Sequence, residues 1–448
     1  MAPDRNRFHY SPRNGADARV SGAPPGEPRR LGRQAVGVSM TTRGPPLAAE
    51  RDDNLVRRVP RSPRRGQRCE ERLPGMNEHA VHRVRRLLRS QRLEAALFSN
   101  PATITWLTGY APPIQAGPSP FEAGPALCWV TPGSLQVLAS NLESGAAGAS
   151  GAQVVEYVGY TIDEPLANAA HMTAGLAAML GAPSGLRGRV GVELDGLPAP
   201  LLTAFSAGLP KAALVALDGA FDSDRAVKTP EELARIRAAV RVCDAAQAYA
   251  RRHARAGQSE IELWGALKAD LEVTLGTRLP VLVDLVGGKR TAEIGGLPGP
   301  YVLQPGDPLI LDFVPRVDGY WGDNTDTHFV GEPSPELAKI YSLVHAALRR
   351  GVEAVRPGVK ANELDAILRG AIRQSGYEVY PHHSGHGLGA SYHEEPRLVP
   401  YNTRSLEAGM VIAIEPGVYV PEVGGVRLEH VVVVTPDGCD VLTTHLSD

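Results

Sequence analysis

Residues 309–327 read Leu-Ile-Leu-Asp-Phe-Val-Pro-Arg-Val-Asp-Gly-Tyr-Trp-Gly-Asp-Asn-Thr-Asp-Thr, and this stretch decides the fold of the second half of the chain. Its apolar start ends in Asp312, the turn residues Asp318-Gly319 follow, and an aromatic pair then leads to Asp323. The pattern predicts a β-hairpin that brings the two acids together. Like charges at close range destabilise the free protein, and a bound cation would relieve their repulsion. On this stretch alone, the alternative that both acids merely flank turns is equally well supported.

The composition indicates a globular protein with more than one domain. A chain of 448 residues is long for a single core, and its formal net charge is only -2. The sequence contains no run of eighteen or more apolar residues, so we expect a soluble, cytoplasmic protein without a membrane partner. The four cysteines are scattered, without the spacing of a zinc site or a disulfide framework, and reduced thiols are therefore expected.

Residues 1–75 differ in composition from the rest of the chain. They contain sixteen arginines, ten prolines, eight acidic residues and no lysine, with almost no apolar periodicity. The remaining residues 76–448 therefore carry a net charge of about -10. We interpret the segment as a disordered Arg/Pro-rich extension, or as the product of a gene start placed too far upstream. Nucleic-acid binding by a basic arm is the alternative, and no specific nucleic-acid partner is expected.

Residues 76–222 are predicted to form an α/β domain. Strand-like runs alternate with helical stretches and lie at residues 93–98, 126–130, 135–139, 154–158, 190–194 and 213–217. The domain contains no glycine-rich phosphate loop and no nucleophile elbow. Its expected role is structural or in subunit contacts.

Residues 223–448 are predicted to form a second domain, in which helices cover a set of strands. Thr229-Pro230-Glu231-Glu232 combines a capping box with a proline at the first helical position, which is typical of a helix start. Cys243 falls on the apolar face of that helix and is predicted to be a core residue rather than a reactive thiol. Further helices are expected from Ser259, Ser334 and Asn362.

Five side chains in this second domain are candidate metal ligands. His386 lies in Ser-Gly-His-Gly-Leu-Gly, Glu415 ends an apolar run, and Glu429 precedes another. With Asp312 and Asp323 they offer one imidazole and four carboxylates, whose charge would balance two divalent cations. Each follows or sits within a strand signal, so rigid backbone would hold it. Oxygen-rich ligands favour manganese, although cobalt, zinc or iron would also bind.

The order and spacing of the five residues resemble those of the pita-bread metallohydrolases, which include aminopeptidase P, prolidase, methionine aminopeptidase and creatinase. Asp312 and Asp323 are 11 positions apart, and Glu415 lies 29 positions after His386 and 14 before Glu429. The resemblance implies a creatinase-like α/β N-terminal domain followed by an α+β pita-bread catalytic domain, commonly in a homodimer. Methionine aminopeptidase lacks the first domain, which narrows the resemblance to the Xaa-Pro peptidase branch.

The resemblance also implies a role for each ligand. Asp323 and Glu429 would bridge two metal ions, and Asp312 would chelate one of them. His386 and Glu415 would complete the coordination of the other. Glu415 would also act as the general base when water attacks an amide carbonyl.

Three more residues match supporting positions in the family. His393, seven residues after the histidine ligand, matches the histidine that contacts the scissile amide and its tetrahedral intermediate. Tyr419 and Arg427 fall where the family often places supporting side chains. For Tyr419, packing as an aromatic core residue is as well supported as a role in the site. For Arg427, a structural ion pair is the favoured interpretation. Of His382 and His383, at most one is expected to face the site.

Two positions depart from the family pattern. Aminopeptidase P and prolidase tend to read Asp-x-Ser/Thr-Arg-Thr after the second ligand, whereas Asp326 stands here in place of the arginine. We expect this acid, close to the site, to weaken contact with a substrate carboxylate unless Lys289 or Arg290 compensates. The loop that usually carries a substrate-facing histidine reads Ile-Gly-Gly-Leu at residues 294–297.

These observations leave three hypotheses about function. The first is a dinuclear-metal-dependent peptidase that hydrolyses the N-terminal bond of short peptides, with Xaa-Pro peptides as the expected substrates. The second is a metal-dependent C-N hydrolase or lyase of a small non-peptide metabolite, which the altered loop would permit. The third, a binding module with a vestigial site, predicts degraded ligands, and the intact set argues against it.

Overall fold

The computed structural model describes residues 77–114, 124–163, 165, 167–181 and 184–446. The prediction that residues 1–75 form a disordered extension lies outside the described residues. Within the described part of the chain, no helix has both the length and the apolar character needed to cross a bilayer. The boundaries predicted for the two domains, residues 76–222 and 223–448, stay predictions.

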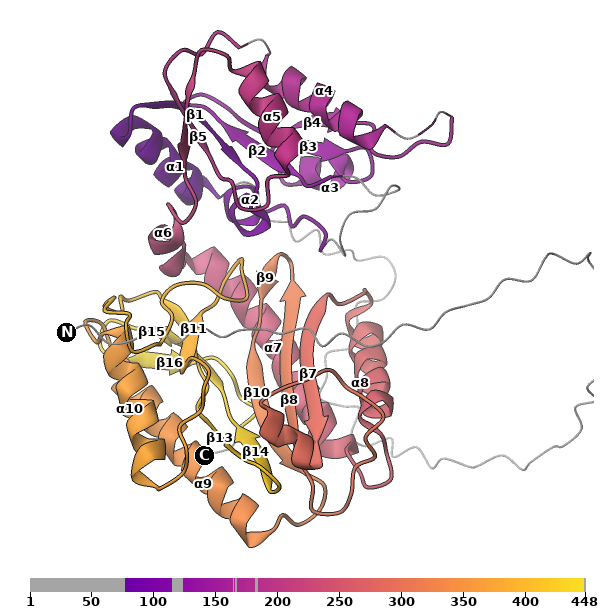
Figure 1. Ribbon diagram of the computed structural model, residues 1–448, viewed down its shortest axis with the longest axis vertical. Coiled ribbons are helices and arrows are strands. Elements are labelled where there is room, and N and C mark those ends of the chain that lie inside the picture. The colour runs from indigo at the N-terminus through magenta and orange to yellow at the C-terminus, as the bar shows by residue number, and fades with distance from the viewer. Residues whose placement is uncertain (1–76, 115–123, 164, 166, 182–183, 447–448) are drawn as a thin grey trace, which may run out of the picture. The chain divides into compact units, whose positions relative to one another are not determined.

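The first folded region contains a six-stranded sheet with the order β4-β3-β2-β1-β5-β6 (Figure 1). Its strands are β1 (Leu93–Phe98), β2 (Leu127–Val130), β3 (Leu135–Ser140), β4 (Gln153–Tyr157), β5 (Arg189–Val192) and β6 (Ala213–Ala216). β1 pairs parallel with β5 and antiparallel with β2, so the sheet is mixed. All six strands lie where the sequence predicts them, and the α/β class is confirmed.

Helices cover both faces of this sheet. They are α1 (Glu78–Ser90), α2 (Pro101–Thr108), α3 (Ser144–Ala149), α4 (Asn168–Leu180) and α5 (Ala199–Gly208). The short helix α6 (Asp222–Ala226) follows in the link to the second region, and its Ala226 packs in the core of that region. Because side chains alternate along a strand, β1 sends Ala96 and Phe98 to a core shared with α1 and α2. Ala95 and Leu97 point to the opposite core, shared with α4 and α5.

The second region contains two four-stranded sheets and a two-stranded ribbon. Its strands are β7 (Val281–Gly287), β8 (Pro308–Val317), β9 (Tyr320–Trp321), β10 (Asn324–Phe329), β11 (Gly385–Gly387), β12 (Val411–Ile414), β13 (Gly417–Val420), β14 (Gly424–Arg427), β15 (His430–Val434) and β16 (Cys439–Val441). One sheet has the order β10-β8-β7 with β9 paired to β8, and the other has the order β11-β12-β15-β16. β13 and β14 form the ribbon.

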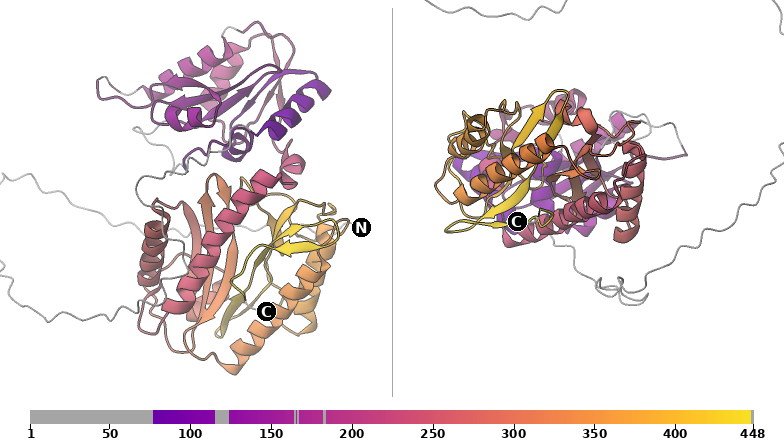
Figure 2. Two further views of the ribbon diagram at one scale, coloured as in Figure 1. Left: turned by 180° about the vertical axis from the view of Figure 1, so that it is seen from behind. Right: turned by 90° about the horizontal axis from the view of Figure 1, so that it is seen from below.

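Helices lie along both sheets, as Figure 2 shows from behind and from below. They are α7 (Pro230–His253), α8 (Glu260–Leu275), α9 (Pro335–Ala354) and α10 (Ala361–Gln374), with a short 3₁₀ helix η2 (Gly288–Glu293) after β7. Capping boxes start α7 at Thr229 and α8 at Ser259, as predicted. Cys243 of α7 is fully buried in a core with residues of β8, which confirms that it is a core residue. α9 and α10 pack on β12 and β15.

Candidate metal centre

The predicted hairpin presents Asp312 and Asp323 from neighbouring strands. β8 and β10 pair antiparallel with Asp312 opposite Thr325, and Asp323 stands one residue before β10. The turn between β8 and β9 uses Asp318 and Gly319 at φ values of 48° and 83°, a conformation that Asp and Gly tolerate best. Backbone hydrogen bonds therefore hold both carboxylates close together before any ligand binds.

Two of the candidate ligands have one oxygen satisfied and the other unpaired. Oδ2 of Asp312 accepts a hydrogen bond from Nη2 of Arg427 at 2.8 Å, and Oε2 of Glu429 accepts one from Oγ1 of Thr325 at 2.9 Å. Oδ1 of Asp312 and Oε1 of Glu429 are buried and have no hydrogen-bond partner among the described residues. Burying such oxygens without a partner is costly, and a cation would remove the cost.

His386 presents an unprotonated nitrogen to the carboxylates. It lies on β11, and its Nδ1 is 2.9 Å from the carbonyl oxygen of Gly387. A carbonyl oxygen only accepts hydrogen bonds, so Nδ1 carries the proton and Nε2 keeps its lone pair. Nε2 is 3.5 Å from Oδ2 of Asp323 and 3.7 Å from Oε1 of Glu415. Burial lowers the pKa of His386, which keeps the imidazole neutral and available as a ligand.

The buried acids oppose one another's ionisation. Burial and the charges of their neighbours raise the pKa values of Asp323 and Glu429 well above the ordinary range. Burial likewise raises the pKa of Asp312 to about 6, although Arg427 acts in the opposite direction. Burial alone would also raise the pKa of Glu415, but the hydrogen bond from His383 and the nearby imidazoles lower it to about 2.

These residues fit divalent cations. Ligand atoms of Asp323, His386 and Glu429 all lie within 4.8 Å of one another. The unpaired oxygens of Asp312 and Glu429 and the Nε2 lone pair of His386 can donate electron pairs to a metal ion, because no hydrogen bond from the described residues occupies them. Four carboxylates and one imidazole suit hard or borderline ions such as Mn²⁺ or Zn²⁺.

Arg427 and Tyr419 both contact candidate ligands or their neighbours. The guanidinium of Arg427 donates to Asp312, and its Nη1 donates to the hydroxyl of Tyr419 at 3.2 Å. That hydroxyl is also 2.9 Å from Nε2 of His382. Because Nδ1 of His382 donates to a backbone carbonyl, Nε2 accepts, and the Tyr419 hydroxyl donates to it. The chain of bonds from Arg427 through Tyr419 to His382 fixes one wall of the site, and the catalytic roles of Tyr419 and Arg427 stay predictions.

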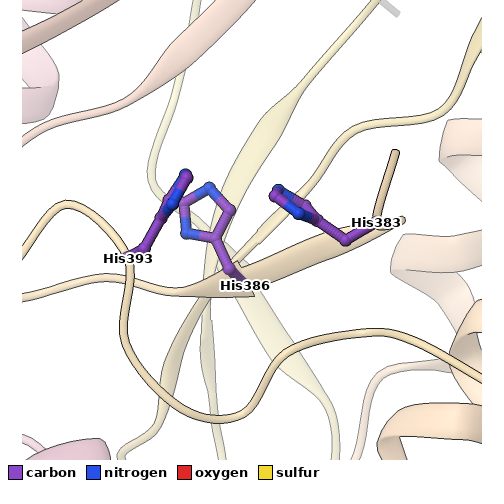
Figure 3. Close-up of side chains that lie close together, drawn as sticks. All are labelled: His383, His386 and His393. Carbon is purple, nitrogen blue, oxygen red and sulfur yellow. The ribbon is translucent and has the colours of Figure 1, made fainter. Parts of the chain in front are cut away.

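Three histidine rings gather around the candidate ligand His386, as Figure 3 shows for His383, His386 and His393. The ring centroids of His386 and His393 are 4.2 Å apart, and that of His383 lies 5.2 Å from that of His393. Nε2 of His383 donates to Oε1 of Glu415 at 2.9 Å. His393 is an exposed residue, but partial desolvation of its ring and the two neighbouring histidines lower its pKa to about 3, so the ring is neutral at physiological pH.

The expectation that at most one of His382 and His383 faces the site is wrong. His383 contacts Glu415 directly, and Nδ1 of His382 is 3.9 Å from the other oxygen of the same carboxylate. Strand alternation would have separated the two side chains. Residues 381–384 form a bend rather than a strand, so successive side chains can point the same way.

The expectation that Asp326 lies close to the site is also wrong. Thr325 and Thr327 of β10 bond to Glu429 and to the Arg427 backbone on the site side. Asp326 lies between them on the opposite face, buried, with Oδ2 at 2.9 Å from Nη2 of Arg251 on α7. The aspartate that stands in place of the family's arginine therefore forms an ion pair on the face of β10 opposite the candidate ligands.

The compensating cations proposed from the sequence have other partners. Lys289 pairs with Glu422 at 2.7 Å, and both side chains are exposed. Arg290 pairs with Glu260, which lies fully buried at the start of α8. Arg251, 75 residues away in sequence, balances Asp326, and sequence spacing alone gives no signal for that partner.

Comparison with known families identifies both halves of the chain. Residues 234–436 match the metallopeptidase family M24, and residues 81–227 match the creatinase/prolidase N-terminal domain. An uncharacterized peptidase of Bacillus subtilis is 32% identical over 256 residues, which cover 57% of this chain and 72% of the relative. The Xaa-Pro dipeptidase of Pyrococcus furiosus is 36% identical over 229 residues, which cover 51% of this chain and 66% of the relative.

Solved structures agree over a longer span. An Xaa-Pro dipeptidase from Bacillus anthracis superposes with a TM-score of 0.70 at 27% identity, covering 83% of this chain and 98% of that one. The prolidase of Pyrococcus horikoshii superposes with a TM-score of 0.70 at 26% identity, covering 82% of this chain and 99% of that one. The similarity thus includes both the six-stranded sheet region and the candidate metal centre.

Proposed function

Because the chain belongs to the metallopeptidase family M24, we propose that it hydrolyses the N-terminal peptide bond of short peptides, with Xaa-Pro peptides as its substrates. The proposal is supported above all by the buried, mutually repelling carboxylates that leave oxygens of Asp312 and Glu429 without a donor among the described residues. Relatives named Xaa-Pro dipeptidase support the choice of substrate.

Two divalent cations, with manganese as the proposed metal, would occupy this centre. Asp323 and Glu429 would lie between the two ions, Asp312 would hold one, and His386 with Glu415 would hold the other. When bound, such ions supply Lewis acidity and lower the pKa of water towards neutrality. The protein contributes the fixed positions of the ligands and the Nε2 lone pair of His386, which the bond to Gly387 sets in place.

Glu415 is the proposed general base. With a pKa lowered to about 2 it is ionised at neutral pH, and its Oε1 is held at 2.9 Å by Nε2 of His383. A carboxylate held in this way can accept the proton of an attacking water and deliver it to the leaving nitrogen.

His393 is the proposed stabiliser of the substrate carbonyl. Its ring is neutral and lies beside His386, so it can donate a hydrogen bond as negative charge develops on the carbonyl oxygen. Because the imidazole is neutral, it adds no positive charge to the site before the reaction begins.

The direct test measures turnover of Xaa-Pro dipeptides and Xaa-Pro tripeptides by the manganese-loaded protein. Hydrolysis of dipeptides alone would indicate a prolidase, and hydrolysis of longer peptides would indicate an aminopeptidase P. Glu429→Ala should abolish hydrolysis and lower the bound metal, measured by elemental analysis. Cleavage of an acylated small metabolite with no cleavage of either peptide class would instead support the C-N hydrolase.

A cytoplasmic homodimer completes the proposal. Cys128, Cys243 and Cys439 are free thiols, which suits a reducing compartment. The homodimer rests on the family resemblance, and light scattering on the purified protein tests it.

A further inference from the structure

Asp284 is a carboxylate beside the candidate metal centre that no role above uses. It lies on β7, directly opposite Asp312 in the antiparallel pairing with β8. Its side chain is 38% exposed, compared with 4% for the guanidinium side chain of Arg427 next to it. Its negative charge also acts on Asp312: after burial, it is one of the charges that raise the Asp312 pKa. Asp284 is therefore near the ligands and open to solvent.

The Asp284 carboxylate occupies the space that a side chain at position 295 would need. A Cβ atom on Gly295 would overlap this carboxyl group. Ile294, just before it, has a φ of 80°, which is strained for a β-branched residue, and its carbonyl oxygen accepts a hydrogen bond from Arg427. The loop is thus fixed in a form in which an acid, rather than a loop side chain, borders the site.

Asp284 also keeps capacity to bind a further cation. Within the described part of the chain, its nearest cationic atom is Nη2 of Arg427 at 3.7 Å, whereas the same atom is 2.8 Å from Asp312. Lys289 and Arg290, the two cations of the adjoining η2 helix, pair with other glutamates as described above. The Asp284 carboxylate is therefore available to accept a hydrogen bond from a cationic group of the substrate.

We infer that Asp284 recognises a positively charged group of the peptide substrate, an inference that rests on the proposed peptidase function. An ammonium or guanidinium group beside β7 would gain a charge-assisted hydrogen bond, and a carboxylate there would be repelled. A peptide offers such a cation from two sources, the free α-amino group or a basic side chain next to the scissile bond. Asp284 is thus a specificity-determining residue for cationic over anionic substrate ends.

The experiment compares the full-length, manganese-loaded protein with Asp284→Asn on two matched substrate pairs. Lys-Pro-Ala and norleucyl-Pro-Ala differ in the side-chain cation. Ala-Pro-Ala and propionyl-Pro-Ala differ in the α-ammonium group. For one pair, the wild type should favour the cationic member by about tenfold or more in kcat/KM, and Asp284→Asn should remove most of that preference, chiefly through KM. The pair that responds identifies the source of the cation.

Unchanged ratios for both pairs in Asp284→Asn would overturn the inference. Asp318→Asn is the matched control, because it removes an exposed carboxylate in the turn after β8 and should leave both ratios unchanged. Metal content is measured in every variant. If Asp284→Asn binds less metal, the salt dependence of the wild-type ratios decides, since a charge-based preference must weaken with ionic strength.

Failure of the proposed function gives a different result. If the wild type cleaves none of the four peptides, calorimetric binding of lysinamide, norleucinamide and hexanamide to the manganese-loaded protein replaces turnover. Tighter binding of a cationic ligand that Asp284→Asn abolishes would keep the role of Asp284 while the peptidase proposal fails. Equal binding of the three ligands by wild type and variant would overturn the inference.

Discussion

The two faces of β10 use similar polar side chains but differ in how these are partnered. On the site face, Thr325 supports Glu429, while carboxylate oxygens around it have no donor among the described residues. On the other face, Asn324 and His328 bond to Gln247, and Oδ2 of Asp326 pairs with Arg251, so that a cation of the protein balances this acid although its Oδ1 has no donor among the described residues. One face stores charge repulsion that a ligand can relieve, and the other balances its charge within the protein.

The difference shows that an acid on β10 cannot be assigned a role from its distance along the sequence to a metal ligand. Asp323 and Asp326 are three residues apart, yet the first lies 3.5 Å from Nε2 of His386 and the second pairs with Arg251 of α7. Function follows from the face of the strand and from the partner across it. Four changes test that division.

Removing one carboxylate from each of the two faces of the β10 region should give the largest difference in activity between two variants. Asp323→Asn should lower kcat/KM by about 1,000-fold or more and reduce the bound metal, because a proposed bridging ligand is lost. Asp326→Asn should keep activity within about twofold and lower the free energy of unfolding by about 1–2 kcal/mol. Kinetics, elemental analysis and denaturant unfolding measure these effects. Equal losses of activity in the two variants would contradict the division between the faces.

The metal-free protein should lose stability as pH rises from about 4 to about 6. Burial and neighbouring acids raise the pKa of Asp312 from 3.8 to about 6, so the folded state binds this proton more tightly than the unfolded chain does. The stabilisation, about 3 kcal/mol in full, is present below pH 3.8 and is lost as pH rises through the folded value; roughly 2 kcal/mol of it is lost between pH 4 and pH 6. Saturating Mn²⁺ should replace the proton and remove this loss.

Thermal melts across this pH range, with and without Mn²⁺, provide the measurement. Asp326→Asn serves as the control, since it should retain the pH dependence of the metal-free wild type. A metal-free protein whose stability rises steadily from pH 4 to pH 6 would argue against mutual repulsion among the site carboxylates.

Placing an arginine at position 326 tests the balanced face. Asp326→Arg should set two guanidinium groups against each other, lower the free energy of unfolding by about 3 kcal/mol and leave the Xaa-Pro preference unimproved. The double variant Arg251→Asp/Asp326→Arg should recover most of the lost stability, as a double-mutant cycle would show. A gain in Xaa-Pro turnover in the single variant would restore the expectation that residue 326 faces the substrate.

The smallest effect is expected from Tyr419→Phe, which removes the hydroxyl between Arg427 and His382. We expect a loss of about threefold to tenfold in kcat/KM and about 1 kcal/mol in stability. Tyr320→Phe is the control. The hydroxyl of Tyr320 donates a hydrogen bond of 3.0 Å to Glu232, which is not a candidate metal ligand, so only stability should fall. Equal kinetic losses in both variants would indicate a general loosening rather than a role of Tyr419 at the site.

Much of the fold could be predicted because it depends on local patterns. The hairpin at residues 309–327 follows from apolar runs, a turn that tolerates positive φ, and the period of a strand. The candidate ligands, among them His386 and Glu415, could be selected because each follows or sits within a strand signal. The capping boxes at Thr229 and Ser259 are equally local.

The errors and omissions depend on partners distant in sequence or on irregular backbone. Arg251 pairs with Asp326 although the two are 75 residues apart, and no local sequence pattern near either residue predicts this ion pair. His382 and His383 lie in a bend, where alternation does not apply. Asp284 did give a local signal, because a lone acid interrupts the apolar run of β7, but only its register opposite Asp312 shows why it matters.

The candidate ligands come from both sheets, and this arrangement has a consequence for assembly. Asp312 and Asp323 belong to the hairpin, whereas His386 and Glu415 belong to the β11–β12 part of the second sheet. The backbone N–H of Glu429, 117 positions after Asp312, bonds to the carbonyl of Thr325 and joins the two. A metal-binding site of this kind cannot exist in a half-folded chain, since such long-range closure comes late in folding. Metal uptake would then report that the last strands have docked, and partial unfolding of either sheet would release the metal.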